Sequence, residues 1–440
     1  MHNRIIIKEK INNFEKKIVI PGDKSISIRW VLIASLASGL SQAKNLLLSE
    51  DVLAAIKVIK KLGVKVKFKN QTCKVYGVGV DGYKYKKGII LDAQNSGTLG
   101  RLIAGILINS PYSIKIIGDN SLSKRDFKRV ADPLKEFGAK FELRNKNNLP
   151  LKVIGSEYLK PINYFEKRGS AQCKSSVILA ALNTPGKTTI YAKKSRNHTE
   201  LFLKYLKLPI KIIEKKKYDK IEISGQHQFK SFNYEIPGDV SSSAFFIVLT
   251  LLSKNSKLKI KNINVNPTRI GFIKIINKMG ANVKFINKRI VCGEKLADIC
   301  VKSQNNFKPI NCPVELNSNA IDEFLIIFLL ATKASGISIF KKLEELNKKE
   351  SPRLKWGSKI LNKMGIKNVT TNNSIKIFGN PNLKINKKII IENYLKDHRV
   401  FMTSVVAALS FGGVWKIHDS KSIKTSFPNF LKVINQLKKK

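Results

Sequence analysis

Three short stretches of the sequence carry carboxylates that could transfer protons, and two of them also place basic side chains beside the carboxylates. Asp322 and Glu323 stand directly before an apolar run, residues 324–331. Near cationic neighbours an aspartate such as Asp322 stays ionised and can accept a proton from a hydroxyl group. The other two stretches contain Lys349, Glu350 and Arg353, and Asp397, His398 and Arg399. We therefore expect acid–base chemistry on anionic substrates. The alternative for Asp322 is that it simply caps the helix that follows.

Other polar stretches open directly into helical runs and carry side chains that bind anions. The N-terminus of a helix has unpaired N–H groups and about half a positive charge, so phosphate and carboxylate groups bind there readily. The candidate ligands at these openings are Lys24, Ser25, Arg29, Gly97, Arg101, Ser170, Ala171, Gln172 and Lys174. Arg125 and Arg196 lie in polar or basic loops, and surface charge or a plain loop position is the alternative for them. Any single opening is explained by ordinary capping, but several together favour a site for a strongly anionic small molecule.

The openings that would position these side chains recur along the chain at similar spacing. They begin at residues 21, 94, 169, 237, 319 and 397, so successive starts are 68 to 82 residues apart. A second, amphipathic helix follows each opening, most often ending on a glycine before a β-branched strand. This spacing is longer than that of solenoid repeats and predicts six copies of a compact α/β unit.

The repeats also pair on a larger scale. PGDKSIS at Pro21 and PGDVSSS at Pro237 are near copies, and each follows a short apolar strand. Proline–glycine pairs mark places where the chain turns. We interpret them as two crossings of a hinge, near 20–22 and 236–238, between a lobe of residues 21–236 and a second lobe of residues 1–20 plus 237–440. Each lobe would contain three units.

Composition limits the class of protein. The 440 residues carry a formal net charge of +50, yet 43% of them are apolar, which excludes a disordered polybasic tail. The lysines run evenly from end to end instead of clustering with aromatic residues, so we expect no nucleic-acid partner. No apolar run approaches the roughly 18 residues of a membrane span, and the five scattered cysteines indicate reduced thiols in the cytoplasm. Arginine is rare beside lysine, and its planar fork suits two-point contact with phosphate or carboxylate.

The motifs of these openings resemble one known family, the EPSP synthases (3-phosphoshikimate 1-carboxyvinyltransferases), in the family's order from about Pro21 to Phe430. The segments that carry the resemblance are PGDKSISIR, NSGT, SLSKRDFKRV, GSAQCKS, SRNHTE, IPGDVSSSAFF, NPTRIG, IDEF, EELNKKESPRL, DHRVFM and KTSFPNF. The resemblance implies an inside-out α/β barrel fold: two lobes, each of three βαβαββ units, that close on substrate.

The resemblance also implies a reaction and its residues. The enolpyruvyl group of phosphoenolpyruvate would pass to the 5-hydroxyl of shikimate 3-phosphate through a tetrahedral adduct, with no metal or other cofactor. The implied ligands of shikimate 3-phosphate are Lys24, Ser25, Arg29, Ser170, Ala171, Gln172, Arg196, Asp322 and Lys349. Those of phosphoenolpyruvate are Lys24, Gly97, Arg125, Gln172, Arg353 and Arg399. Asp322 would take the hydroxyl proton, Glu350 would protonate the methylene carbon, and Lys24 completes the catalytic set. We expect a cytoplasmic monomer with these two small molecules as its partners.

The chain departs from the family's pattern at two positions. Ile28 stands where the family commonly has histidine, and Pro352 where it has aspartate, which could alter the backbone between Glu350 and Arg353. Gly97 leaves room at the phosphoenolpyruvate site, so we expect glyphosate to compete there. The alternatives are a UDP-N-acetylglucosamine enolpyruvyl transferase, which has Lys-Asn where this chain has Lys24-Ser25 and a loop cysteine unmatched here, and a basic nucleic-acid-binding module.

Overall fold

The computed structural model describes residues 3–69 and 72–438, which divide into two compact units. The central unit comprises Gly22–Ile236 and the short segment Ile290–Glu294. The terminal unit takes the described residues up to Pro21, then Pro237–Arg289 and those from Lys295 onward. The chain therefore passes between units at residues 21/22 and 236/237, and again on either side of residues 290–294. The repeat pattern assigned this last segment to the other lobe.

The sheets of the central unit share one plan: two parallel strands at one edge, followed by two antiparallel strands. In the first sheet the order is β14 (Asn233–Glu235), β3 (Ser38–Lys44), β5 (Thr72–Val78) and β4 (Lys65–Lys69). In the second it is β6 (Ile90–Asp92), β7 (Ile114–Ile117), β9 (Asn148–Ile154) and β8 (Lys140–Arg144). In the third it is β10 (Asn163–Glu166), β11 (Lys187–Lys193), β13 (Tyr218–Ser224) and β12 (Ile210–Glu214).

Among the described residues, the terminal unit has this four-stranded plan in one sheet and three strands in each of the other two. Strands from both ends of the chain take part. One sheet has the order β16 (Lys284–Val291), β17 (Glu294–Lys302), β15 (Lys257–Asn264) and β2 (Glu15–Val19). Another has β18 (Ile337–Phe340), β20 (Ile375–Phe378) and β19 (Asn368–Thr370). The last has β21 (Lys388–Ile391), β22 (Val414–His418) and β1 (Arg4–Ile7). The strand β2 pairs with β15 in the terminal unit, and the PGD segment that follows β2 starts a helix in the central unit. The strand β14 pairs with β3 in the central unit, and the PGD segment that follows β14 starts a helix in the terminal unit.

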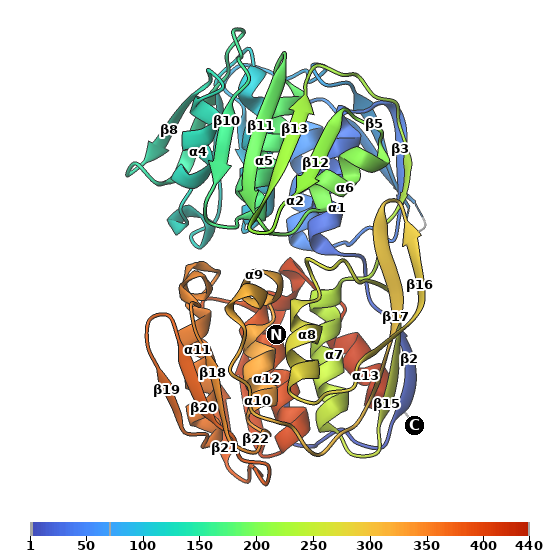
Figure 1. Cartoon of the computed structure of the whole chain (residues 1–440), viewed down its shortest axis with the longest axis vertical. Helices are drawn as coiled ribbons and strands as arrows, with labels where there is room; N and C mark the ends of the chain where they lie inside the picture. The colour runs from blue at the N-terminus through green and yellow to red at the C-terminus, as the bar shows by residue number, and fades with distance from the viewer. Residues whose placement is uncertain (1–2, 70–71, 439–440) are drawn as a thin grey trace. The chain divides into compact units, whose positions relative to one another are not determined.

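Each repeat supplies one long buried helix and one amphipathic helix, as the sequence predicted. The buried helices are α1 (Lys24–Leu36), α3 (Gly97–Ile106), α5 (Ala171–Leu182), α7 (Val240–Leu252), α10 (Phe324–Ala331) and α12 (His398–Phe411). The amphipathic helices are α2 (Glu50–Lys61), α4 (Lys128–Lys135), α6 (His198–Tyr205), α8 (Gly271–Lys278), α11 (Arg353–Met364) and α13 (Phe430–Lys438). In each unit the strands lie on the outside and the long helices between them (Figure 1). Helices that are apolar all round, such as α10, are stable only in such an interior position.

Local geometry adds detail to two of the expected openings. The opening at Gln94 begins with a turn in which Gln94 has φ 51°, and the helix starts only at Gly97. The opening at Asn319 is a short helix, α9 (Asn317–Ala320), followed by a turn that contains Asp322. Asp322 is therefore held by a turn between two helices and is not part of a continuous helical run. The predicted left-handed helix ends occur, for example at Gly365, and Lys207 with φ 56° takes this role where the sequence has no glycine.

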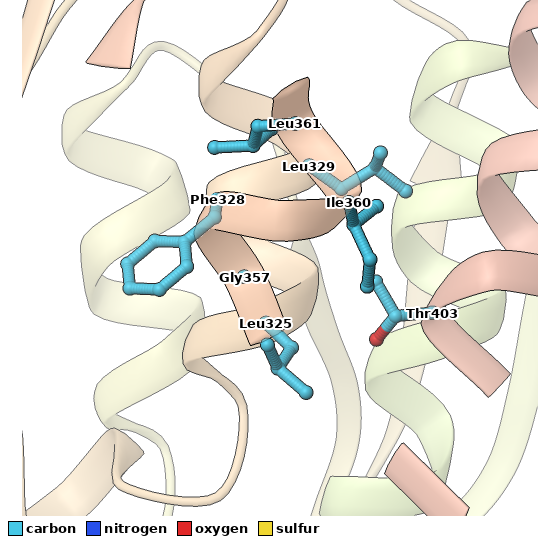
Figure 2. A pocket seen from close by; sticks show the side chains of 7 residues that line it. All are labelled: Leu325, Phe328, Leu329, Gly357, Ile360, Leu361 and Thr403. Atoms are coloured by element: carbon cyan, nitrogen blue, oxygen red, sulfur yellow. The ribbon is translucent and has the colours of Figure 1, made fainter. Parts of the chain in front are cut away.

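The interior of the terminal unit is closely packed where α10, α11 and α12 meet (Figure 2). A small space remains there, lined by Leu325, Phe328, Leu329, Gly357, Ile360, Leu361 and Thr403, and it cannot hold a water molecule. A β-carbon on Gly357 would lie 2.8 Å from the ring of Phe328, so the glycine permits this close approach of α11 to α10. This space belongs to the core and contains none of the predicted site residues. Within the described ranges, no helix has the length and apolarity required to span a membrane.

Candidate active site

The first opening of the central unit places Lys24 and Arg29 on one helix with different surroundings. Asp23 caps α1 by accepting a hydrogen bond from the backbone N–H of Ile26 at 2.9 Å. The Lys24 ammonium lies 2.9 Å from the carboxylate of Asp51, in the first turn of α2, and its side chain keeps 21% of its exposure. Lys24 can therefore reach a ligand while its charge is held in place.

Arg29 lies deeper and joins three helices. Its Nε donates to the hydroxyl of Thr199 at 2.8 Å, and its Nη2 donates to Ser175 at 3.0 Å. A third bond, from Nη1 to the carbonyl oxygen of Ser25 at 3.0 Å, ties the guanidinium to the first turn of α1. With only 3% of its surface exposed, Arg29 fixes α1 against α5 and α6.

The second and third openings meet through Gln172. Arg101 donates a hydrogen bond to the Gln172 carbonyl oxygen, and the Gln172 amide donates to Thr98 at 2.9 Å. A β-carbon on Gly97 would lie 3.2 Å from Nη1 of both Arg101 and Arg125, so two guanidinium groups converge on the start of α3. Burial lowers the pKa of Arg101 to about 10, and the nearby arginines Arg129 and Arg125 act in the same direction. We call Lys24, Arg29, Gly97, Arg101, Arg125 and Gln172 the central cluster.

The remaining predicted residues of this unit have local roles in the structure. The Ser170 hydroxyl caps α5 by accepting from the backbone N–H of Cys173 at 3.3 Å, and Ala171 is the first helical residue. Lys174 is buried in an ion pair with Glu200 at 2.6 Å, so it stabilises the fold instead of facing a ligand. Arg196 lies in the loop before α6 and is partly exposed.

In the terminal unit, Arg353 is the centre of an ionic network that joins the three predicted stretches. Its Nε donates to Asp397 at 2.8 Å, its Nη1 donates to Asp322 at 3.2 Å, and its Nη2 donates to Glu350. Lys349 adds a second cation 3.3 Å from Asp322. The two predicted acid–base residues, Asp322 and Glu350, are thus held by one guanidinium group.

Electrostatics favour the ionised forms of Arg353 and Asp397. Burial alone would lower the pKa of Arg353, but Asp397, Glu350 and Asp322 outweigh it and the net shift is upward. Burial alone would raise the pKa of Asp397, yet the Arg353 guanidinium keeps that pKa below its usual value. Because Asp397 is also the N-cap of α12 and accepts from Ser351 at 2.9 Å, it fixes Arg353 to the helix end.

Arg399 joins the same network from the first turn of α12. Its Nη1 donates to the carbonyl oxygen of Asp322 at 2.7 Å and lies 3.7 Å from the carboxylate of Glu323. We call Asp322, Glu323, Lys349, Glu350, Arg353, Asp397 and Arg399 the terminal cluster.

The two clusters have opposite chemical character. The central cluster offers cations and amide groups, which suit phosphate and carboxylate binding. The terminal cluster gathers four carboxylates around three cations in a chain with only 31 acidic residues and a net charge of +50. Carboxylates held this close to fixed cations are suited to accepting and donating protons. Over residues 3–69 and 72–438, no three His, Cys, Asp or Glu side chains are grouped in a way that could hold a metal ion.

The sequence did not identify every member of these clusters as a functional residue. Glu323 and Asp397 were named only as parts of the acidic stretches, with no role of their own, and Asp51, the partner of Lys24, was not named at all. Their roles depend on which cation the fold brings to them. Arg269, which binds the N-terminal turn of α7, could have been found by the rarity of arginine in this lysine-rich chain.

Comparison with known proteins gives one consistent result. The family model for EPSP synthase (3-phosphoshikimate 1-carboxyvinyltransferase) matches residues 8–434. A 3-phosphoshikimate 1-carboxyvinyltransferase from Ruthia magnifica is 40% identical over 97% of this chain and 96% of its own length. Another from a Thermoanaerobacter strain is 40% identical, with 98% and 100% covered.

Solved structures agree on the fold. An EPSP synthase from Acinetobacter baumannii superposes with a TM-score of 0.86 at 32% identity, covering 99% of this chain and 98% of that one. The enolpyruvyl transferase NikO from Streptomyces tendae has a TM-score of 0.77 at 12% identity, with the same coverage, and this likeness concerns the fold alone.

Proposed function

The chain belongs to the EPSP synthase family, and on this premise we propose how its two clusters divide the work of the reaction. As an enzyme of this family it transfers the enolpyruvyl group of phosphoenolpyruvate to the 5-hydroxyl of shikimate 3-phosphate and releases phosphate, a step of the shikimate pathway. The inside-out α/β fold expected from the resemblance is confirmed by the solved relatives.

We propose that the central cluster binds the phosphate and carboxylate groups of the substrates. Its support is the convergence of Arg101 and Arg125 on Gly97, together with the Gln172 amide beside them. Lys24 and Gln172 would lie between the two substrates, with Arg29, Ser25, Ser170, Ala171 and Arg196 on the side of shikimate 3-phosphate. Backbone N–H groups at the starts of α1, α3 and α5 would add to the attraction for anions.

For the terminal cluster we propose that Asp322 is the base. Its pairing with Lys349 and Arg353 favours the ionised form, which can take the proton of the 5-hydroxyl as the oxygen attacks C2 of phosphoenolpyruvate. The methylene carbon must gain a proton in the same step and become a methyl group. When the C2–O bond to phosphate breaks, that methyl group loses a proton and the double bond is restored.

Glu350 is the proposed acid, and its contact with Arg353 suggests how it becomes one. Phosphoenolpyruvate would draw the guanidinium groups of Arg353 and Arg399 to its own charges. Glu350 would then lose the cation that now stabilises its ionised form, and its affinity for a proton would rise. The single observation that carries this proposal is the simultaneous binding of Asp322, Glu350 and Asp397 by Arg353.

The test is Asp322→Ala beside the near-isosteric Asp322→Asn, assayed for phosphate release and for shikimate 3-phosphate binding. We expect turnover to fall by about a hundredfold or more in both, as is typical for the loss of a general base, with binding largely retained. Glu315→Gln, an exposed carboxylate in the same unit, is the matched control and should behave as wild type. Normal turnover of Asp322→Asn would remove Asp322 from the role of base.

We also propose that glyphosate competes with phosphoenolpyruvate at the central cluster, because Gly97 has no β-carbon that would push Arg101 and Arg125 away from the start of α3. Phosphate release should fall as glyphosate rises and recover when phosphoenolpyruvate is added. Unchanged turnover at glyphosate concentrations far above that of phosphoenolpyruvate would contradict this.

A further inference from the structure

A buried chain of polar side chains in the terminal unit ends at Arg399 and includes none of the proposed substrate ligands before it. It begins at Arg269, which is 2% exposed and lies between β15 and α8. Its Nη2 donates to the hydroxyl of Ser241 at 2.8 Å and lies 3.2 Å from the carboxylate of Asp239, the N-cap of α7. The opening of α7 is thus engaged in binding an arginine of its own unit.

Ser241 passes the contact to Glu323. Its hydroxyl donates a hydrogen bond to Oε1 of Glu323, which is itself only 2% exposed. In the part of the chain that the structure describes, the other carboxylate oxygen, Oε2, has no hydrogen-bond partner. A buried carboxylate with an unsatisfied oxygen is costly, so its retention calls for a compensating interaction.

Arg399 compensates the charge of the Glu323 carboxylate through Oε1, the oxygen that also accepts from Ser241. Its Nη1 lies 3.7 Å from Oε1 of Glu323 and donates to the carbonyl oxygen of Asp322 at 2.7 Å. Both contacts use Nη1, so within residues 3–69 and 72–438 they hold one corner of the guanidinium group and leave Nε and Nη2 for a planar anion. An arginine side chain loses rotamer freedom when it is fixed, and a group fixed in advance does not incur that entropic cost on binding.

We propose that Glu323 is a positioning residue for phosphoenolpyruvate binding: its carboxylate, held by Ser241 and Arg269, fixes the guanidinium of Arg399. This inference rests on the proposed role of Arg399 as a ligand of phosphoenolpyruvate. It gives a function to the α7 opening, which supplies no proposed substrate ligand.

The first test is Glu323→Gln, which keeps an acceptor for Ser241 and removes the negative charge. We expect KM for phosphoenolpyruvate to rise about tenfold with kcat changed less than about threefold, because an interaction that fixes a ligand affects binding more than the chemical step. Binding of shikimate 3-phosphate should not change. Ser241→Ala should shift KM in the same direction by a smaller factor, and it keeps the test available if Glu323→Gln folds poorly.

The matched control is Asp298→Asn. Asp298 is a largely buried carboxylate of the same unit with its own lysine and backbone partners, and it lies outside both clusters. It should lower the unfolding free energy without raising KM for phosphoenolpyruvate. If Asp298→Asn raises that KM as much as Glu323→Gln does, the effect is one of general stability and the proposal is wrong.

A double-mutant cycle separates this inference from the proposed function on which it rests. If Glu323 acts through Arg399, Glu323→Gln will not raise KM further when Arg399→Gln is already present. Equal effects of Glu323→Gln in both backgrounds would overturn the positioning role. If Arg399→Gln alone leaves KM for phosphoenolpyruvate unchanged, the role of Arg399 fails, and this inference with it. If Arg399→Gln raises KM and Glu323→Gln does not, only the positioning role fails.

Discussion

Gly97 matters because it is the residue on which two guanidinium groups converge. In Gly97→Ala the new methyl group would stand 3.2 Å from Nη1 of Arg101 and of Arg125, closer than ordinary contact, so at least one must move. We expect KM for phosphoenolpyruvate to rise by roughly tenfold, since misplacing a ligand by 1 Å can cost a hundredfold in rate. The unfolding free energy should change little or rise slightly, because alanine favours helix more than glycine does.

Steady-state kinetics with each substrate varied in turn will check the Gly97→Ala prediction. The KM for shikimate 3-phosphate is the internal control, because Gly97 is assigned only to the phosphoenolpyruvate side. An unchanged KM for phosphoenolpyruvate would mean that the substrate does not approach the start of α3.

For single residues, the sequence was informative where a reactive residue type is also rare in this lysine-rich chain, as the acidic residues and arginines are. Asp322, Glu350, Arg353 and Arg399 were recognised from their types and their motifs, and the structure brings them into one network. Glu323 could not be assigned from its type, because only the fold shows that its neighbours are Ser241 and Arg399. The sequence likewise could not show that Lys174 is buried against Glu200.

Among the helices, the buried hydroxyl of Thr403 in α12 allows a clear test of how side-chain packing contributes to stability. Its hydroxyl is buried beside the space in Figure 2 and has no hydrogen-bond partner among the described residues. Thr403→Val replaces that hydroxyl with a methyl group of similar shape, so we expect the unfolding free energy to rise by about 1 kcal/mol. Urea unfolding followed by circular dichroism will measure it.

Thr250 in α7 provides the matched comparison for Thr403. It is equally buried in a helix of the same unit, but its hydroxyl donates to the carbonyl oxygen of Phe246 at 2.8 Å. Thr250→Val should therefore lower the unfolding free energy or leave it unchanged. Equal effects of the two substitutions would show that the hydrogen bond is not what distinguishes these sites.

The pattern of openings and amphipathic helices predicted the helices of the six repeats well, because apolar residues recur at helical spacing in every repeat. It could not show the short helix α9 or the turn that holds Asp322 between α9 and α10, because neither follows that spacing. It also could not show that residues 290–294 pack in the central unit, since β16 and β17 read as an ordinary hairpin of their own repeat.

For the whole molecule, residues 290–294, the tip of the hairpin formed by β16 and β17, belong to the central unit, so the chain also passes between the units on either side of this tip. These passages are additional to those at the two PGD segments. The anchor of the tip is a buried pair: Nδ1 of His198 lies 2.5 Å from the carboxylate of Glu294, and both side chains have no exposed surface. Glu294→Ala leaves His198 buried without this partner, so we expect the unfolding free energy to fall by about 3 kcal/mol. Glu294→Gln keeps an acceptor and should cost less. Equal stability of Glu294→Ala and wild type would mean that the pair does not anchor the tip.

The net charge of +50 also bears on how the two units respond to substrates. Mutual repulsion should favour separation of two cationic bodies, and bound anions should reduce it. We predict that the radius of gyration, measured by small-angle scattering, falls when shikimate 3-phosphate is added, and that the same data give the mass of a monomer. Sodium sulfate at matched ionic strength is the control, because simple screening acts through any salt. A decrease that sulfate reproduces in full would assign the effect to screening, and no decrease with shikimate 3-phosphate would contradict closure on substrate.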